Sequence, residues 1–178
     1  LGKIAPNILN RNFKAASPNQ KWATDITEFN VLGKKLYLSP IIDLFNGEII
    51  SYELSERPNF DQIIAMLKKA FKKITNQTNL ILHSDQGWQY QMKQYQTILK
   101  DKGIIQSMSR KGNCLDNAII ENFFGILKSE LFYLKQYKSI TQLKHEIKEY
   151  IIYYNNDRIK QNLKGMSPIQ YRAHYYQN

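Results

Sequence analysis

The chain has 178 residues and a formal net charge of +10, from 25 Lys and Arg against 15 Asp and Glu. This length suits one compact domain, which buries roughly 70% of its unfolded surface. The single Cys114 excludes an internal disulfide, and the lack of a Cys/His cluster argues against a structural zinc site, so we expect a reducing compartment. No stretch reaches the ~20 apolar residues of a membrane span, and none forms a signal peptide. The charge suits a polyanionic partner, with solubility as the simpler explanation.

The N-terminal segment, residues 1–20, contains two prolines, four asparagines and little periodicity. This composition predicts a loosely structured arm or linker, with an ordinary frayed terminus as the alternative. The first residue is Leu1 and not Met, so we expect the sequence to be part of a longer chain. Residues 21–178 are predicted to form the folded core with its C-terminal helices.

Strand patterns follow over residues 22–31, 34–43 and 48–55, and we predict three antiparallel strands. Gly33 marks the first turn and Asn46-Gly47 the second. Asn-Gly between apolar runs is a strong hairpin signal, because both residues tolerate the positive φ of a type I′ turn.

Two acids lie on these strands. Period-two alternation places Asp25 on a strand face that it shares with Ala23 and Phe29, where a lone acid is unusual. Asp43 precedes the second turn, where an Asp usually caps backbone amides, so we favour that role over a ligand role.

A helix is predicted to begin at Pro58-Asn59, with lysines on its solvated face and an apolar stripe formed by Phe60, Ile63, Ile64, Leu67, Phe71 and Ile74. The short apolar run 80–82 then predicts a buried parallel strand. Asp85 follows at its carboxyl end, where Gln86-Gly87 lets the chain turn away and leaves the carboxylate open to a ligand. His83 shares the strand face of Asp85, and hydrogen bonding or packing is favoured over metal ligation.

A helix over residues 90–102, with Gly103 as its C-cap, and a fifth strand over residues 104–108 come next. The loop 109–113 is polar and basic. Its Arg110 and Lys111 favour phosphate contact, with solvated loop charge as the alternative.

The following helix carries an apolar stripe of Ile120, Phe123, Phe124, Leu127 and Leu131. A neighbouring stripe contains Asn117, Glu121, Gly125 and Lys128, and it can face a site. Gly125 costs about 1 kcal/mol relative to Ala in a helix, which indicates either close approach of a ligand or backbone, or core packing. Lys128 lies roughly 10 Å from Glu121 along the helix axis.

Residues 139–157 predict a long helix that covers the sheet. Tyr153, Tyr154 and Arg158 could stack on bases or grip phosphate, although an aromatic stripe at helical spacing is more often core. Ser167-Pro168 is an N-cap followed by Pro at the first helical position, and it predicts a short final helix through Tyr171.

Asp25, Asp85 and Glu121 come from separate elements that folding can bring together. Three carboxylates within about 4 Å would repel by a few kcal/mol at an effective dielectric near 20, so such a cluster needs a cation. The spacing between the last two is 121 − 85 = 36, which leaves 35 residues between them.

This pattern resembles the catalytic core of insertion-sequence transposases of the retroviral-integrase type, whose signature is two Asp and a Glu with 35 residues between the last two. The supporting segments, from Trp22 to Tyr171, are WATDIT, HSDQGWQY, SRKGNCLDNAIIENFFGILKSE, YYNNDRIK and MSPIQY. Many relatives carry His after the Asn-Asn-x-Arg run. This chain has Ile159-Lys160-Gln161 after Arg158, so a role of that His does not carry over.

The resemblance implies a ribonuclease-H-like α/β fold with a five-stranded mixed sheet flanked by helices. It implies metal-dependent cleavage and strand transfer of DNA at insertion-element ends, with two Mg²⁺ or Mn²⁺ ions held by Asp25, Asp85 and Glu121 and with Asp25 as the bridge. Predicted DNA contacts are Lys128, Arg110, Lys111, Asn117 and Arg158.

The expected partners are double-stranded DNA and further copies of the chain assembled on it, with no membrane, in a bacterial cytoplasm. An upstream DNA-binding domain is expected in the complete transposase. The alternatives are a nuclease of the same fold that does not join strands, and a non-catalytic DNA-binding or assembly module. The three intact acids argue against the second alternative.

Overall fold

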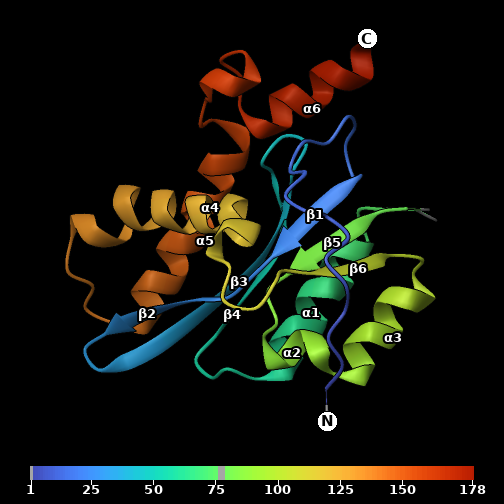
Figure 1. Cartoon of the computed structure of the whole chain (residues 1–178). Coiled ribbons are helices and arrows are strands. Elements are labelled where there is room, and N and C mark those ends of the chain that lie inside the picture. The colour runs from blue at the N-terminus through green and yellow to red at the C-terminus, as the bar shows by residue number, and fades with distance from the viewer. Residues whose placement is uncertain (1, 76–78) are drawn as a thin grey trace.

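The structure is a computed structural model that describes residues 2–75 and 79–178 (Figure 1). Its strands are β1 (Lys21–Thr24), β2 (Thr27–Val31), β3 (Lys34–Asp43), β4 (Ile49–Ser55), β5 (Ile81–Ser84) and β6 (Ile105–Met108). Its α-helices are α1 (Phe60–Phe71), α2 (Trp88–Gln91), α3 (Lys93–Asp101), α4 (Ala118–Glu130), α5 (Ile140–Asn156) and α6 (Pro168–Gln177). Short 3₁₀ turns are η1 (Cys114–Asn117), η2 (Phe132–Leu134) and η3 (Gln161–Leu163).

The strands of the described ranges form one mixed sheet. β3 pairs antiparallel with β1, β2 and β4, whereas β5 pairs parallel with both β1 and β6. β1 and β2 occupy consecutive stretches of the same edge of β3, so together they take the place of the single strand predicted over residues 22–31. The five-stranded mixed sheet is therefore confirmed, with its first strand interrupted.

The interruption at Asp25 and Ile26 has a local cause. The Asp25 carboxylate accepts a hydrogen bond from the Ile26 N–H at 2.8 Å, which removes that donor from the ladder. Continuing the register of β1 and β2 with β3 places Pro40 opposite Asp25, and proline has no N–H to donate. Asp25 therefore lies at a break in the strand.

The type I′ turn lies in the first hairpin, and not at Asn46-Gly47 as predicted. Leu32 (φ 53°) and Gly33 (φ 80°) both have positive φ, as a type I′ turn requires. At the second turn only Gly47 has positive φ, at 74°, and its N–H donates to the Asp43 carbonyl at 2.8 Å. The antiparallel pairing is confirmed, but the type I′ expectation for Asn46-Gly47 is wrong.

The cap role of Asp43 is confirmed. This fully buried carboxylate accepts hydrogen bonds from the backbone N–H groups of Phe45 and Asn19, each at 2.9 Å. It also pairs with the Arg172 guanidinium of α6 at 2.7 Å. The turn is therefore closed around a buried ion pair and does not offer a ligand site.

Helices cover both faces of the sheet, so the molecule has three layers (Figure 1). α4 and α5 pack on one face, in a core that includes Ala23 and Phe29. α1 and α3 pack on the other face, in a core that includes Trp22. The alternation along the first strand thus separates the two cores and turns Asp25 toward the α4 side.

The predicted helices form with two corrections. α1 begins after Asn59 and α5 after Ser139, and each of these cap side chains accepts a backbone N–H. The predicted N-cap at Ser167 is confirmed, with Pro168 as the first residue of α6. The helix expected over residues 90–102 is broken at Met92, which is extended (ψ 137°) and separates α2 from α3. The last helix continues past Tyr171 to Gln177, because Arg172 is anchored by ion pairs with the β3–β4 turn.

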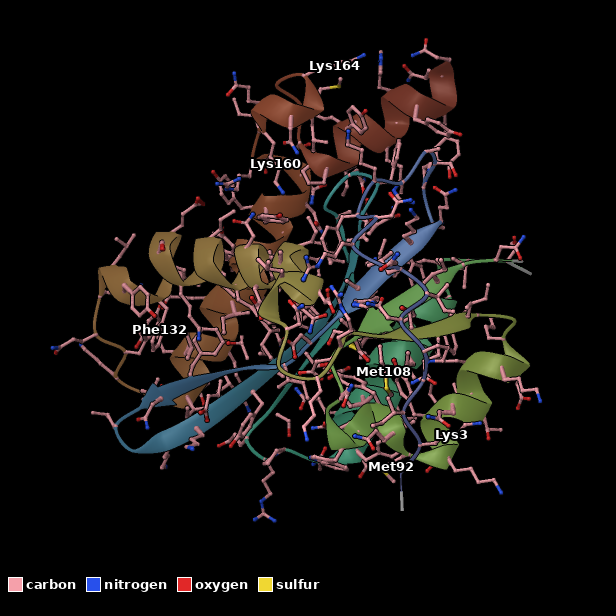
Figure 2. All side chains as sticks on the ribbon, in the orientation of Figure 1. Lys3, Met92, Met108, Phe132, Lys160 and Lys164 are labelled. Carbon is pink, nitrogen blue, oxygen red and sulfur yellow. The ribbon has the colours of Figure 1, made fainter. Side chains whose placement is uncertain are left out.

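The arm of residues 2–20 forms no helix or strand, but it is fixed to the molecule. The Ile8 and Leu9 N–H groups donate to the Ser107 hydroxyl at 2.9 and 3.0 Å, and Leu9 is 3% exposed. The Met108 N–H donates to the Pro6 carbonyl at 3.1 Å. Figure 2 shows the arm crossing Met108 on its way from the N-terminal end. A loosely structured arm is therefore the wrong description of this segment.

Candidate active site

The pairing of β1 with β5 brings Asp25 and Asp85 together. The parallel register matches Lys21 with Ile81, and 81 − 21 = 60; Ala23 pairs with His83 at the same offset. Two residues further on, the same offset places Asp25 level with Asp85, and neighbouring strands lie about 4.8 Å apart. Both acids thus lie at the carboxyl ends of the parallel strands β1 and β5.

The proximity of Asp85 affects the pKa of the Asp25 carboxyl. Burial, followed by the charge of Asp85, raises the pKa of this carboxyl to about 7, and Glu121 adds a smaller repulsion of the same sign. Only the hydrogen bond from the Ile26 N–H acts in the opposite direction. The negative charge that these acids would carry together is therefore uncompensated by the protein around Asp25.

Asp85 is oriented by the turn that follows it. Its Oδ1 accepts a hydrogen bond from the Gly87 N–H at 2.7 Å. A Cβ at position 87 would lie 2.9 Å from the same oxygen, closer than real Cβ contacts come. Glycine at this position therefore allows the backbone to hold the carboxylate from one side and leaves its other oxygen available.

Glu121 reaches the site from α4, where it lies in the first turn and is exposed. It lines a groove of about 460 Å³ together with Asp85, Gln86, Gly87, Ser109, Arg110, Lys111, Gly112, Asn113 and Asn117. In residues 2–75 and 79–178, no three Asp, Glu, His or Cys side chains converge closely enough to hold a metal ion. The structure thus brings Asp25 and Asp85 together and places Glu121 on the groove beside them.

These residues fit a hard divalent cation. Carboxylate oxygens are the ligands that Mg²⁺ prefers, and it commonly binds through one or two of them. The ion pairs found within the described part of the chain include none of the three acids. Burial and the charge of Asp85 both raise the pKa of Asp25, and a bound cation would favour its ionised form against both.

His83 lies behind the acids and takes the role favoured from the sequence. It is 1% exposed, and its Nδ1 lies 2.8 Å from the Ser107 hydroxyl, within hydrogen-bond distance. Burial lowers the pKa of its imidazole. The Ser107 hydroxyl also accepts hydrogen bonds from two backbone N–H groups of the arm. His83 is therefore part of the hydrogen-bonded structure that joins the arm to β5.

Three predicted DNA contacts lie on the groove. Lys111 is exposed at its rim, and Arg110 lies beside it, with its guanidinium paired to Asp116. Asn117 is 7% exposed, and its Oδ1 has no hydrogen-bond partner among the described residues. The basic loop and Asn117 therefore border the same groove as Asp85 and Glu121.

The other two predicted contacts, Lys128 and Arg158, are engaged within the protein. The Lys128 ammonium donates to the Glu28 carbonyl at 3.2 Å and lies 5.2 Å from the centre of the Phe29 ring. Arg158 makes a two-pronged pair with Glu130, with distances of 2.7 to 3.0 Å, and its side chain is 21% exposed. Binding of DNA by either side chain stays a prediction.

Two alternatives left open by the sequence are decided. A Cβ at Gly125 would meet nothing within 4 Å, so this exposed glycine does not serve core packing, and the space above it is open. Tyr154 is 1% exposed and belongs to the core between the sheet and α5, whereas Tyr153 is 46% exposed. The aromatic stripe is therefore divided between core and surface.

The sequence analysis missed Asp116. This acid is 1% exposed and binds two arginines, Arg11 of the arm and Arg110 of the groove loop. Its sequence signal was weak, because an acid in the first turn before a helix is ordinary. Only the tertiary structure shows that a distant arginine reaches it.

Comparison with known proteins gives the class. The description "Integrase core domain" applies to two family models, which match residues 15–114 and 121–175. The chain therefore belongs to the integrase core domain family, as its motifs suggested.

The relatives include a transposase and a transposase-like protein. InsK of Escherichia coli (strain K12), named as a transposase for insertion sequence element IS150, is 60% identical over 176 residues, which are 99% of this chain and 62% of that protein. A transposase-like protein of Haemophilus influenzae is 57% identical over 173 residues, 97% of this chain and 80% of that protein. The chain thus spans less than two thirds of the length of the first of these relatives.

Solved structures confirm the ribonuclease-H-like fold. The HTLV-2 integrase catalytic core domain in complex with magnesium matches with a TM-score of 0.69 at 18% identity, over 89% of this chain and 99% of that chain. A chain of a simian T-cell lymphotropic virus intasome complex matches with a TM-score of 0.72 at 18% identity, over 96% of this chain and 57% of that chain. None of the helices in the described ranges is long and apolar enough to cross a membrane.

Proposed function

We propose that this chain is the catalytic core of a transposase that cuts DNA at the ends of an insertion element and joins those ends to target DNA. The observation that carries the proposal is the pair of level carboxylates, Asp25 and Asp85, on adjacent parallel strands beside Glu121. The family and its transposase relatives support the choice of reaction.

Asp25, Asp85 and Glu121 would hold the divalent cations, Mg²⁺ or Mn²⁺, with Asp25 shared between two ions. When bound, such a pair supplies activation of a water or a DNA 3′-hydroxyl and stabilisation of the leaving oxygen in an in-line displacement. The Gly87 N–H holds the Asp85 carboxylate at the groove, and the Ile26 N–H holds the carboxylate of Asp25 beside it. A magnesium complex is known for the HTLV-2 catalytic core, which has this fold.

The groove loop would hold the DNA. Lys111 and Arg110 supply positive charge at the rim, and Asn117 lines the same groove, where its side-chain NH2 would donate to a phosphate oxygen. Lys128 and Arg158 would extend the contact along α4 and beyond it. Element ends and target duplex are the proposed partners, with several copies of the chain assembled on them. Structures of the HTLV-2 catalytic core in a dimeric and a trimeric form support self-association.

The test uses the chain, and the full-length transposase that contains it, with labelled duplexes that carry candidate element ends. Mg²⁺ or Mn²⁺ is added, and nicks and joined products are mapped on sequencing gels. Nicks at the element ends together with joined products are expected. Cleavage without joining would identify a nuclease, and binding without turnover in either metal would identify a non-catalytic module.

A further inference from the structure

Asp116 is a buried carboxylate shared by two arginines from distant parts of the chain. Its Oδ1 accepts from the Arg11 Nε at 3.0 Å and from an Arg110 terminal nitrogen at 3.0 Å. Its Oδ2 accepts from the Arg110 Nε at 3.1 Å and from the Arg110 backbone N–H at 2.8 Å. Asn7 approaches the same oxygen at 3.5 Å. The carboxylate is thus bound on every side by the arm and by the groove loop.

The two arginines face different surroundings. The Asp116 side chain is 1% exposed, whereas those of Arg11 and Arg110 are 42% and 52% exposed. Arg110 lines the groove with Asp85 and Glu121, but Arg11 does not. Arg110 is therefore the arginine that a DNA phosphate in the groove could recruit.

Recruitment of Arg110 has a consequence for Asp116. A buried charge that loses its only partner is strongly destabilised, because it stays out of water without compensation. Arg11 is a second partner already in place. It is held there by contacts that do not involve its guanidinium, since Leu9 is buried and Ser107 accepts two N–H groups of the arm.

We infer that Arg11 remains as the counter-ion of Asp116 when Arg110 leaves it to bind DNA. When the Arg110 guanidinium turns to a phosphate in the groove, Asp116 keeps the guanidinium of Arg11. The arm is thereby a positioning element of the DNA site, although Arg11 need not touch DNA. This inference rests on the proposed function, since it takes the groove to be a DNA site.

The test is a variant cycle read by the salt dependence of binding, which counts phosphate contacts. Each contact contributes a slope of about −0.9 to log K against log[salt]. The probe is a fluorescein-labelled duplex of mixed sequence, titrated without divalent metal at several salt concentrations. Arg110→Gln should reduce the magnitude of the slope by about 0.9. Arg11→Gln should reduce it equally, because Arg110 then stays on Asp116, and the double variant should show no further reduction.

Two variants separate exchange from damage to the fold. Arg11→Lys keeps a cation on Asp116 and should retain the wild-type slope. The double variant Arg11→Gln/Asp116→Asn lacks the negative charge that binds Arg110, so its slope should return to the wild-type value. Lys72→Gln is the control for loss of one positive charge. Lys72 is the exposed C-cap of α1 and does not line the groove, so this change should leave the slope unchanged. Circular dichroism melts confirm that each variant is folded.

Additive losses from Arg11→Gln and Arg110→Gln would overturn the inference, because they would mean that both arginines contact phosphate directly. Failure of Asp116→Asn to restore the slope in a folded protein would also overturn it. A wild-type chain that binds the duplex without any salt dependence would instead overturn the proposed DNA groove, and the inference with it.

Discussion

Asp25 and Asp85 lie level with each other at the carboxyl ends of two adjacent parallel strands, because β1 and β5 pair at a constant offset of 81 − 21 = 60 residues. The break after β1 belongs to the same arrangement. At this break the Asp25 carboxylate accepts the Ile26 N–H. Pro40 lies opposite Asp25 and has no N–H to donate to the strand ladder. Strand pairing therefore sets the position of both acids before any ligand binds.

Replacing each acid by its amide should abolish chemistry and keep the fold. Asp25→Asn, Asp85→Asn and Glu121→Gln are nearly isosteric, so cleavage and joining of element ends in Mg²⁺ should fall to background while duplex binding is largely retained. Gel assays of products and anisotropy of binding measure the two properties. If one of these variants cut and joined at the wild-type rate, that residue would lose its assignment.

Divalent metal should stabilise the chain through the same acids. At a Mg²⁺ concentration about ten times its dissociation constant, the free energy of unfolding should rise by about 1.4 kcal/mol. Thermal melts with and without Mg²⁺ measure this shift. Asp85→Asn should lose it, whereas Asp101→Asn, at an exposed acid on α3, should keep it. Equal shifts in the two variants would show that metal binds elsewhere.

Lys128→Ala tests whether the lysine on α4 holds DNA as well as bracing the fold. Loss of its contact with Phe29 should lower the free energy of unfolding by about 0.5–1 kcal/mol. If Lys128 also binds phosphate, end processing should be impaired and the salt slope should fall in magnitude by about 0.9. Lys72→Ala is the matched control, and a Lys128 variant with the same slope as this control would remove Lys128 from the DNA site.

Lys160 should give the protein a pH-dependent stability. Its ammonium donates to the Tyr154 hydroxyl and lies 4.6 Å from the centre of that ring, and burial, followed by the charge of Arg158, lowers its pKa to about 8. Because the unfolded chain titrates near 10.5, the charged lysine costs stability below pH 8, and this cost disappears as the pH rises from about 8 to 10.5.

Lys160→Met should therefore gain most relative to wild type at neutral pH, by about 1–3 kcal/mol, given that one pKa unit corresponds to about 1.4 kcal/mol. The gain should shrink between pH 8 and pH 10.5. Urea unfolding of both proteins across this range measures it. Lys148→Met, on the exposed face of α5, provides the control, and a constant difference between Lys160→Met and wild type would contradict the prediction.

The sequence by itself determined the local elements and the identity of the acids. The turn glycines, the cap at Ser167 and the apolar stripe of α1 depend on nearby residues, so they can be predicted without a structure. The spacing of Asp85 and Glu121 within a set of ordered motifs identified the family. The roles of Asp25, Asp85 and Glu121 stay a proposal, supported by the proximity of Asp25 to Asp85.

Only the tertiary structure decided which charges are free and which are paired. Arg110 and Arg158 look alike in the sequence, but each is bound to an acid, Asp116 or Glu130, that lies on another element. The docked arm was likewise hidden, because Ser107 and Asp116 hold it from about 100 residues away in the chain. Such contacts are long-range: no local pattern specifies them, since burial and partner geometry arise only when distant segments pack together.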